Sequence, residues 1–468
     1  MPGMMFGIDE EAKRAGPALI DAAAGETWTY GRLVEEVRRR RDALGAPRKA
    51  LVFHFCGNTL SAVAWYLAAL EAGHAIALAA EKLDPSLRGG LLAAFRPEFV
   101  VLSENPGPEY AGGAPQGLWR RAAEDVPGIH PDLAIMLPTS GSTGSPRYVR
   151  LTRRNVEANA ASIRQALGLS AADRPIAHLP LYYSYGLSVV NSHLNAGAAT
   201  VLTSASLIAA EFWKKVAEQR VSSFSGVPYT YQMLRRLDID KLPAQSISAM
   251  TQAGGKLDEK SVAHFHARMA ARDGSFWVMY GQTEATARIA VLPASMLPEK
   301  LGTAGIAIPG GSLSVEGEDG SVLGADTPGE LVYRGPNVMM GYAASRADLS
   351  RGDELHGVLR TGDRGSLDAA GYVTILGRAK RDVKVFGLRI NMDDVEAMVK
   401  PHGAAAVVGA GDKLIVYCEF GSPAQLSEIR AALSAKLRLH AGALDFRRIA
   451  KLPVSASGKI DYAQLETQ

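Results

Sequence analysis

The chain has 468 residues, of which 47% are hydrophobic and 21% charged, with a formal net charge of +3. This length is too great for one hydrophobic core and predicts two to four domains or subdomains. The small net charge gives no electrostatic argument for binding nucleic acid. The two cysteines, Cys56 and Cys418, match no metal-ligand spacing and are expected to be buried, reduced thiols of a cytosolic protein.

Targeting and membrane segments are not expected. Residues 1–15 have no apolar core and include several acidic side chains, so they do not resemble a signal peptide. The most apolar segment, 60–80, is interrupted by Glu71, Gly73 and His74 and predicts a buried helix, a turn and a strand instead of a membrane span. The expected location is the cytoplasm, with no nucleic-acid partner.

In the N-terminal three hundred or so residues, predicted strands and helices alternate, which is typical of βαβ units and a mainly parallel sheet. The predicted strands are 28–30, 51–55, 75–80, 99–102, 177–179, 200–202, 222–225 and 276–279. The predicted helices are 31–44, 60–70, 152–167, 208–219 and 229–237. The Pro/Gly-rich segment 105–117 is expected to be a surface loop.

The pattern changes near Gly305. Short alternating runs with turn signals predict a small antiparallel β region at 312–316, 329–334, 358–360 and 372–376. The polar segment 378–382 is predicted to be a hinge. An α+β tail follows, with helices at 392–400 and 426–437 and strands at 405–408 and 414–419.

A loop rich in glycine and hydroxyl side chains follows the apolar run 133–137. Its residues are Thr139, Ser140, Gly141, Ser142, Thr143 and Gly144. A strand followed by such a loop can surround a phosphate with backbone N–H groups and hydroxyls. It is not a Walker A loop, because no Gly-Lys-Ser/Thr follows. Taken alone, an ordinary surface turn remains the commoner explanation.

The segment Tyr280-Gly281-Gln282-Thr283-Glu284 follows an apolar strand, where open α/β sheets place ligands. The ring of Tyr280 suits stacking on a base, and Gly281 allows close approach of the backbone. The hydroxyl of Thr283 suits a phosphate contact, and the carboxylate of Glu284 suits a Mg²⁺ ion. A plain turn with a solvated glutamate is the alternative.

Further along the chain, Asp363 suits a ribose diol, and Arg378 could add hydrogen-bond donors to the same sugar. The run 361–363 lies between two β runs, where an aspartate is usually only a cap. Lys459 lies on a Ser/Gly-rich loop, where most lysines serve solubility.

In this order, these segments resemble the adenylate-forming superfamily, which contains acyl-CoA synthetases, adenylation domains of nonribosomal peptide synthetases and luciferases. The matching segments are 139–146, 280–284, 361–363, 377–387 and 452–459, and weaker similarity extends over nearly the whole chain. The resemblance implies an α/β fold. A large N-terminal domain, 1–379, would contain two βα subdomains and a small β-barrel-like region. A hinge would join it to a small, mobile α+β C-terminal domain, 380–468.

The resemblance implies a two-step reaction. A carboxylate attacks the α-phosphate of MgATP, giving an acyl adenylate and pyrophosphate, and a thiol then takes the acyl group. By position, Thr139–Gly144 would hold the β- and γ-phosphates, Tyr280 would stack on adenine, Thr283 would touch the α-phosphate and Glu284 would bind Mg²⁺. The thiol would be CoA or the phosphopantetheine of a carrier protein acting in trans.

Other positions take roles from the same resemblance. Gly254 and Gly255 would border adenine and the acyl pocket, and Asp363 and Arg378 would hold the ribose. Lys459 would bridge the carboxylate and ATP oxygens, stabilising the charge that develops in the transition state. The acyl pocket is expected to involve Tyr183, Ser184, Gly186, Val227, Gly254 and Gln282.

The C-terminal domain is expected to rotate between the two steps. Lys380 lies at the hinge position, and Lys384 and Gly387 lie on the segment expected to face the thiol. Two residues depart from the pattern: Arg147 replaces a lysine after the phosphate loop, and Phe386 stands where many CoA ligases have a basic residue. The second departure weakly disfavours CoA and leaves a carrier protein open.

The acyl substrate is not identified by the sequence. The window 178–191 contains no acidic residue to pair with a substrate ammonium, so an α-amino acid is disfavoured. The tyrosines of this window suit an aryl or medium-length acyl pocket or, equally, a hydrophobic core. Three functions remain: an acid–thiol ligase, which is favoured; an amino-acid adenylation enzyme; and a catalytically silent nucleotide-binding relative. Transfer of the adenylate to an amine is also open.

Overall fold

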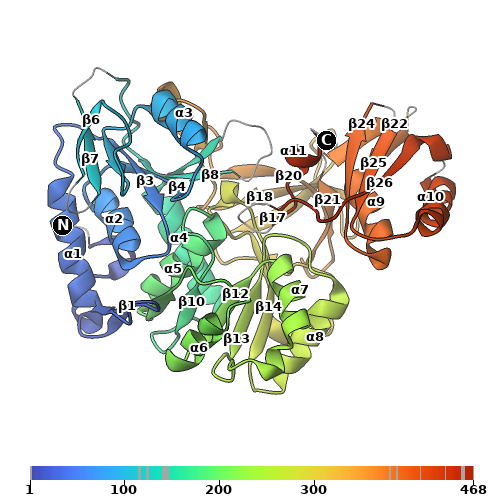
Figure 1. Ribbon diagram of the computed structural model, residues 1–468, viewed down its shortest axis with the longest axis horizontal. Coiled ribbons are helices and arrows are strands. Elements are labelled where there is room, and N and C mark those ends of the chain that lie inside the picture. The colour runs from blue at the N-terminus through green and yellow to red at the C-terminus, as the bar shows by residue number, and fades with distance from the viewer. Residues whose placement is uncertain are drawn as a thin grey trace. The chain divides into compact units, whose positions relative to one another are not determined.

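The computed structural model describes residues 3–113, 117–122, 126–139, 147–378, 381–385, 388–411, 413–437, 439–454 and 459–466. The chain forms two compact units. Unit 1 contains the described residues up to Ser312 together with Arg334–Leu359. Unit 2 contains Leu313–Tyr333 and the described residues from Arg360 onward. Figure 1 shows both units, and each is described here by itself.

Unit 1 contains two large sheets. The first has nine strands in the order β16-β15-β14-β13-β12-β10-β11-β1-β2. Pairing is parallel from β14 to β1 and antiparallel at both edges. The strand bounds, in sheet order, are Ile306–Ala307, Ala290–Leu292, Ser275–Tyr280, Ala249–Gln252, Ser223–Gly226, Pro175–Ala177, Thr200–Leu202, Pro17–Asp21 and Thr27–Thr29.

The second sheet has eight strands in the order β19-β9-β8-β4-β3-β5-β7-β6. Its central strands β8, β4, β3 and β5 are parallel, and the strands outside them are antiparallel. The bounds, in sheet order, are Gly341–Ala343, Tyr148–Thr152, Leu133–Pro138, Ala75–Ala80, Leu51–Cys56, Phe99–Val101, Leu118–Arg121 and Tyr110–Gly112.

The helices of unit 1 cover these sheets, as Figure 1 shows for α7 and α8 beside β13 and β14. Their bounds are α1 Tyr30–Ala43, α2 Leu60–Glu71, α3 Pro85–Phe95, α4 Arg153–Leu167, α5 Ser184–Ala196, α6 Ala210–Glu218, α7 Pro228–Leu237 and α8 Glu259–Ala270. Short 3-10 helices are η1 Met5–Gly7, η2 Glu11–Lys13, η3 Ile239–Lys241, η4 Thr283–Ala285, η5 Ala294–Met296 and η6 Arg346–Ser350.

Local sequence explains helix α4, which follows β9. Thr152 and Asn155 form a capping box at the start of α4, each side chain accepting a hydrogen bond from the other's backbone N–H. Gly168 ends the helix in the left-handed conformation, with φ of 65°. Helix α2 is buried almost all round, because it belongs to a core that also includes side chains of α1 and of both sheets.

Unit 2 contains an α+β region and all but the end residues of a four-stranded sheet. The sheet has the order β17-β18-β20-β21, with bounds Ser312–Glu316, Gly329–Arg334, Val358–Leu367 and Val373–Arg378. Strands β22 (Asp382–Val385) and β23 (Leu388–Asn391) form a ribbon, and β24 (Ala405–Ala410), β25 (Lys413–Cys418) and β26 (Leu444–Arg448) form a three-stranded sheet. The helices are α9 Met392–Val399, α10 Pro423–Leu437 and α11 Tyr462–Glu466, with η8 Lys400–His402 and η9 Ala441–Ala443.

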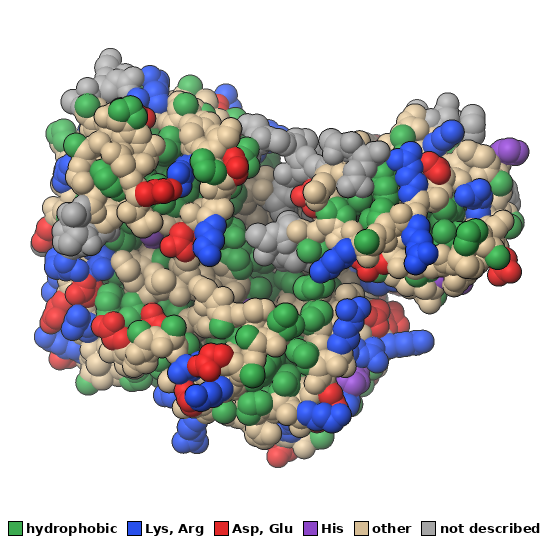
Figure 2. Space-filling model, in the orientation of Figure 1, with side chains coloured by type: hydrophobic (Ala, Val, Ile, Leu, Met, Phe, Trp, Pro, Cys, Tyr) green, Lys and Arg blue, Asp and Glu red, His purple; other side chains and the backbone are tan. Residues whose placement is uncertain are grey.

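The predicted α/β class and most predicted elements are confirmed. Both cysteines are buried and free. Within the described residues, no helix is long and apolar enough to cross a membrane. On the face shown in Figure 2, basic and acidic side chains are interspersed.

Some local predictions were wrong. The segment 105–117 is not only a loop, since it contains β6. The run 361–363 does not lie between two strands but inside β20, where Gly362 takes a φ of +70°. Strand β9 was not predicted. The predicted domain boundary at 379 and 380 falls outside the described residues and stays a prediction.

Candidate functional site

The predicted acyl-pocket and adenine residues follow neighbouring parallel strands of the nine-stranded sheet. The chain leaves β10 toward Tyr183 and Ser184, and it leaves β12 toward Val227. It leaves β13 toward Gly254 and Gly255, and β14 toward Gly281 and Gln282. Because the carboxyl ends of parallel strands meet at one edge of a sheet, the sheet gathers these residues at the edge where α/β folds bind ligands.

Two of the predicted glycines are needed for close backbone approach. A Cβ at Gly281 would overlap the carbonyl oxygen of Ala287, so only glycine fits this turn between β14 and β15. A Cβ at Gly186 would overlap the carbonyl oxygen of Pro180. Close packing near the start of α5 therefore requires glycine at position 186, independently of the predicted acyl pocket.

A hydrogen bond joins the predicted nucleotide segment to the predicted acyl segment. The hydroxyl oxygens of Ser184 and Thr283 lie 3.1 Å apart. Ser184 begins α5 and Thr283 begins η4, so two elements far apart in the sequence meet at this contact. Two predicted site residues of different predicted roles are therefore direct neighbours.

Glu284 is held by a residue that the sequence reasoning missed. The hydroxyl of Tyr342, on β19, donates a hydrogen bond to Oε1 of Glu284 over 2.8 Å. The backbone N–H of Met339 donates to the carbonyl oxygen of Glu284 over 2.9 Å. The only sequence signal for Tyr342 is an aromatic residue that follows a glycine after the apolar run 338–340.

Tyr342 also connects Glu284 to the base of the predicted phosphate loop. The guanidinium carbon of Arg147 lies 4.6 Å from the centre of the Tyr342 ring. The backbone N–H of Thr139 donates to the carbonyl oxygen of Arg147 over 2.9 Å. The other predicted phosphate-loop residues, Ser140 to Gly144, lie outside the described residues.

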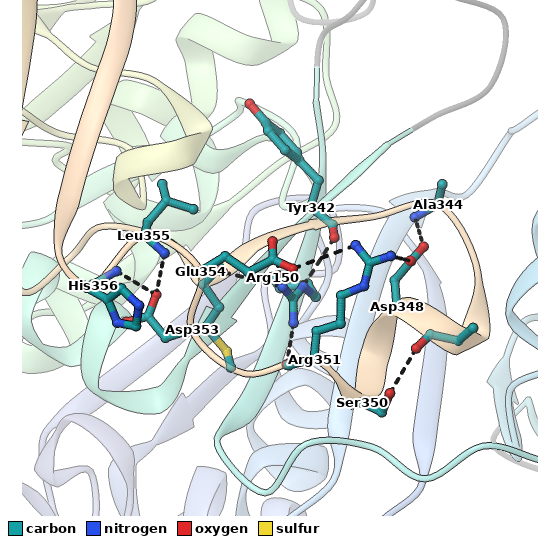
Figure 3. A network of polar contacts seen from close by, with 12 residues as sticks. Arg150, Tyr342, Ala344, Asp348, Ser350, Arg351, Asp353, Glu354, Leu355 and His356 are labelled. Atoms are coloured by element: carbon teal, nitrogen blue, oxygen red, sulfur yellow. Dashed lines mark hydrogen bonds and ion pairs between the residues drawn. The ribbon is translucent and has the colours of Figure 1, made fainter.

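A buried arginine fixes the backbone on either side of Tyr342. The Nε–H of Arg150, on β9, donates to the carbonyl oxygen of Tyr342 over 3.2 Å, and Nη2 lies 3.2 Å from Oε2 of Glu354. Figure 3 shows this network, with the ring of Tyr342 pointing away from the Arg150 guanidinium. The strand that presents the Tyr342 hydroxyl is therefore anchored independently of that hydroxyl.

The turn after Glu284 is held from the same segment. The side-chain amide of Asn337 donates to the carbonyl oxygens of Ala285 over 2.7 Å and Arg288 over 2.9 Å. The hydroxyl of Thr286 donates to the carbonyl oxygen of Asn337 over 2.6 Å. These bonds fix the turn that carries Thr283 and Glu284.

Arg288, at the end of this turn, is a second residue that the sequence reasoning missed. Its side chain is buried, and its guanidinium carbon lies 4.7 Å from the centre of the Tyr185 ring. Burial raises the pKa of the Tyr183 hydroxyl, whose ring packs edge-on against that of Tyr185. The signal that could have found Arg288 is a lone charge within the otherwise apolar run 287–292.

Unit 2 brings the two predicted ribose residues into register. Asp363 on β20 is paired with Arg378 on β21, and the Asp363 side chain is buried. Lys459 lies beside the bridge between Val454 and Ile460. Lys384 lies in β22, whereas Lys380 and Gly387 lie outside the described residues.

The residues fit Mg²⁺ bound together with a phosphate substrate. Within the described residues, no group of three or more His, Cys, Asp or Glu side chains could hold a metal alone. Mg²⁺ typically takes one or two carboxylates and completes its shell with substrate phosphates and water. The carboxylate of Glu284, which accepts a hydrogen bond from the hydroxyl of Tyr342, would be such a ligand.

Two cavities open on unit 1, with volumes of about 740 and 1240 Å³. The smaller is lined by His54, Trp65 and Glu81, among others, and the larger by His74, Arg153 and Asp353. Neither includes a predicted site residue, so the candidate site rests on the contacts above and not on cavity size.

Comparisons with known proteins show the family of the chain. Residues 9–343 match the family described as AMP-binding enzyme. The chain is 32% identical over 357 residues to a sulfoacetate–CoA ligase of Cupriavidus necator, covering 74% of this chain and 69% of that protein. It is 28% identical to a 2-succinylbenzoate–CoA ligase of Bacillus licheniformis, covering 77% of this chain and 78% of that protein.

Solved structures show the same fold. The o-succinylbenzoate CoA synthetase of Bacillus subtilis in complex with an acyl-adenylate intermediate superposes with a TM-score of 0.79 at 25% identity, covering 98% of this chain and 96% of that one. A benzoate CoA ligase of Burkholderia xenovorans LB400 gives a TM-score of 0.77 at 23% identity, covering 98% of each chain.

Proposed function

The chain belongs to the AMP-binding enzyme family, and from this premise we propose how its residues activate an acid and transfer it to a thiol. It is an AMP-forming acid–thiol ligase that converts a carboxylic acid and ATP to an acyl adenylate and pyrophosphate. The observation that carries the residue assignment is the contact between Thr283 and Ser184, because it joins the predicted nucleotide and acyl segments.

In the first step, a carboxylate oxygen of the acid attacks the α-phosphorus of ATP, and the bond to the pyrophosphate oxygen breaks. The hydroxyl of Thr283 would donate a hydrogen bond to an oxygen of the α-phosphate, and the residues from Thr139 to Gly144 would hold the leaving pyrophosphate. Glu284 would hold Mg²⁺, which supplies positive charge against the phosphate oxygens when bound. Tyr342 orients Glu284 for that purpose.

The remaining nucleotide contacts would come from three segments. Tyr280, the last residue of β14, would stack on adenine, next to Gly254 and Gly255 after β13. Asp363 and Arg378, paired across β20 and β21, would hold the ribose hydroxyls. Lys459 would meet the charge that develops at the α-phosphate in the transition state.

In the second step, a thiolate attacks the acyl carbon and AMP leaves. We propose CoA as the thiol, because the relatives named above are CoA ligases. A rotation of residues 380–468 about Lys380 would exchange Lys459 for the segment around Lys384 and Gly387. The acid would be small and would lie beside Tyr183, Ser184, Val227 and Gln282.

The proposal is tested by measuring acid-dependent pyrophosphate release from MgATP over a panel of acids, each with and without CoA. Release with one class of acid, stimulated by CoA, is the expected result. Release without stimulation by CoA would contradict CoA as the acceptor. The absence of release with every acid would contradict the activity itself.

A further inference from the structure

Arg288 is a buried cation with almost none of its hydrogen-bonding capacity used. Its side chain is 2% exposed, and its Nη2–H donates one bond of 3.3 Å to the hydroxyl of Ser188. The Nε and Nη1 atoms are also buried and have no hydrogen-bond partner within the described residues. A guanidinium keeps its proton in proteins, so this is a permanent positive charge away from water.

The other buried arginines of the described chain each have a carboxylate partner. Arg40 pairs with Glu36, Arg150 with Glu354, and Arg346 with Glu98. Arg288 differs from these. The titratable groups around its guanidinium are the hydroxyls of Tyr185 and Tyr183, and both are neutral at physiological pH. An unpaired buried charge costs several kcal/mol, so a folded protein retains one where a ligand supplies the missing partner.

The position of Arg288 identifies that ligand as the acid substrate. The guanidinium lies against Tyr185 and Ser188 on the first turns of α5, the helix that Ser184 begins. Ser184 contacts Thr283, which lies five residues before Arg288 in the sequence. The arginine thus adjoins the predicted acyl segment, while the predicted nucleotide residues Thr283 and Glu284 lie at the start of the same turn.

Its surroundings hold the guanidinium in a fixed place. The hydroxyl of Tyr185 lies 2.9 Å from Oγ1 of Thr251 and donates to the carbonyl oxygen of Thr251 over 3.0 Å. The backbone carbonyl of Arg288 accepts hydrogen bonds from Asn159 and Asn337. A pre-organised fork of donors of this kind suits a planar carboxylate or a sulfonate.

We propose that Arg288 binds a second negatively charged group on the acyl substrate, so that the enzyme activates acids carrying a further carboxylate or a sulfonate. This inference rests on the proposed acid–thiol ligase function and names its substrate class. It agrees with the absence of an acidic residue in 178–191, since a substrate ammonium would meet an unpaired cation.

The test compares acids that carry a second negatively charged group with partners of similar size whose second group is neutral. These are called the charged and the neutral acid of each pair. Malonate is paired with monomethyl malonate, succinate with monomethyl succinate, and sulfoacetate with methylsulfonylacetate. For each acid, kcat/KM is measured by pyrophosphate release in the wild type, in Arg288→Met and in Arg288→Lys. We expect the wild type to prefer the charged member of at least one pair by about 100-fold or more. Comparing the malonate and succinate pairs with the sulfoacetate pair separates a carboxylate site from a sulfonate site.

The variants separate binding from a structural role. Arg288→Met should lose about 100-fold or more on the charged acid, keep its activity on the neutral one and show no lower Tm. Arg288→Lys should retain part of the preference. The preferred charged acid should raise the Tm of the wild type and not that of Arg288→Met. The matched control, Arg346→Met, removes a paired buried arginine and should lower the Tm without changing acid preference.

Two results would overturn the inference while leaving the proposed function intact. One is equal turnover of neutral and charged acids by the wild type. The other is an equal loss on both acids in Arg288→Met together with a lower Tm, as for a purely structural arginine. If no acid of the panel supported pyrophosphate release, that result would instead overturn the proposed function, and the inference with it.

Discussion

The hydroxyl of Tyr342 donates a 2.8 Å hydrogen bond to the carboxylate of Glu284, and the guanidinium carbon of Arg147 lies over the Tyr342 ring, 4.6 Å from its centre. One aromatic side chain thereby connects the proposed Mg²⁺ ligand with the end of the proposed phosphate loop. Because Arg150 holds the backbone of Tyr342 separately, the hydroxyl can be removed without releasing the strand.

Tyr342→Phe is expected to raise the Mg²⁺ concentration required for pyrophosphate release by about 10- to 100-fold, since residues that orient a metal ligand commonly have effects of this size. The Tm should change little. Titration of activity against free Mg²⁺ provides the measurement. Tyr110→Phe is the matched control, because it removes a buried hydrogen bond to Pro97 elsewhere in unit 1. An unchanged Mg²⁺ requirement in Tyr342→Phe would contradict the role of this hydroxyl.

Lys459→Ala is expected to slow adenylate formation by about 100- to 1000-fold, because it removes the cation proposed to stabilise the charge that develops at the α-phosphate. Transfer from a supplied acyl adenylate to CoA should be largely unaffected. The two steps are followed separately, as pyrophosphate release and as thioester formation. Lys451→Ala, at an exposed lysine of the same unit, serves as the control. Equal losses in both steps would show that Lys459 does not have the assigned role.

Gly387→Leu is expected to have the opposite effect, with normal pyrophosphate release and slow thioester formation. A side chain at this position would obstruct the thiol if the segment faces it in the second step. Single-turnover assays with preformed acyl adenylate provide the measurement. Normal thioester output would count against the proposed rotation of residues 380–468 between the two steps.

A pH-dependent contribution to stability is expected from Glu98 and Arg346. Burial opposes ionisation of Glu98, but hydrogen bonds from Arg346 and from the backbone of Leu51 outweigh it and hold the pKa of Glu98 below its ordinary value. A lowered pKa in the folded state stabilises the protein above the ordinary pKa, about 4.3, and this stabilisation is lost as the pH falls through the folded-state value.

Glu98→Gln should therefore lower the free energy of unfolding by about 3 kcal/mol at pH 7, where the variant leaves Arg346 without its anion. The difference from the wild type should shrink steadily below about pH 4. Urea unfolding at several pH values measures it. A difference that is constant from pH 7 to pH 3 would exclude the ion pair as its source.

The sequence predicted the fold well where periodicity is strong. The apolar runs at β3, α2 and β4 were correctly assigned, since each is long and bounded by turn residues. Strand β9 was missed because its five residues include Arg150, whose charge is buried only through partners about 190 to 200 positions away. No local pattern reports such contacts.

Only those site residues that belong to a recognisable sequence motif could be predicted. Thr283 and Glu284 stand in a recognisable segment, and the structure adds the neighbours that orient them. Tyr342 and Arg288 belong to no motif used in the prediction, and their importance depends on contacts between distant segments. The register between Asp363 and Arg378 likewise follows from the pairing of β20 with β21. The sequence pattern instead predicts that 361–363 lie between two strands.

The central claim is that an oxygen of the acid attacks the α-phosphorus of ATP. It is tested most directly with an acid labelled with ¹⁸O in its carboxylate, in a complete reaction with MgATP and CoA. The account predicts one ¹⁸O atom in the AMP recovered from each turnover and none in pyrophosphate. Label in inorganic phosphate, or unlabelled AMP, would contradict it.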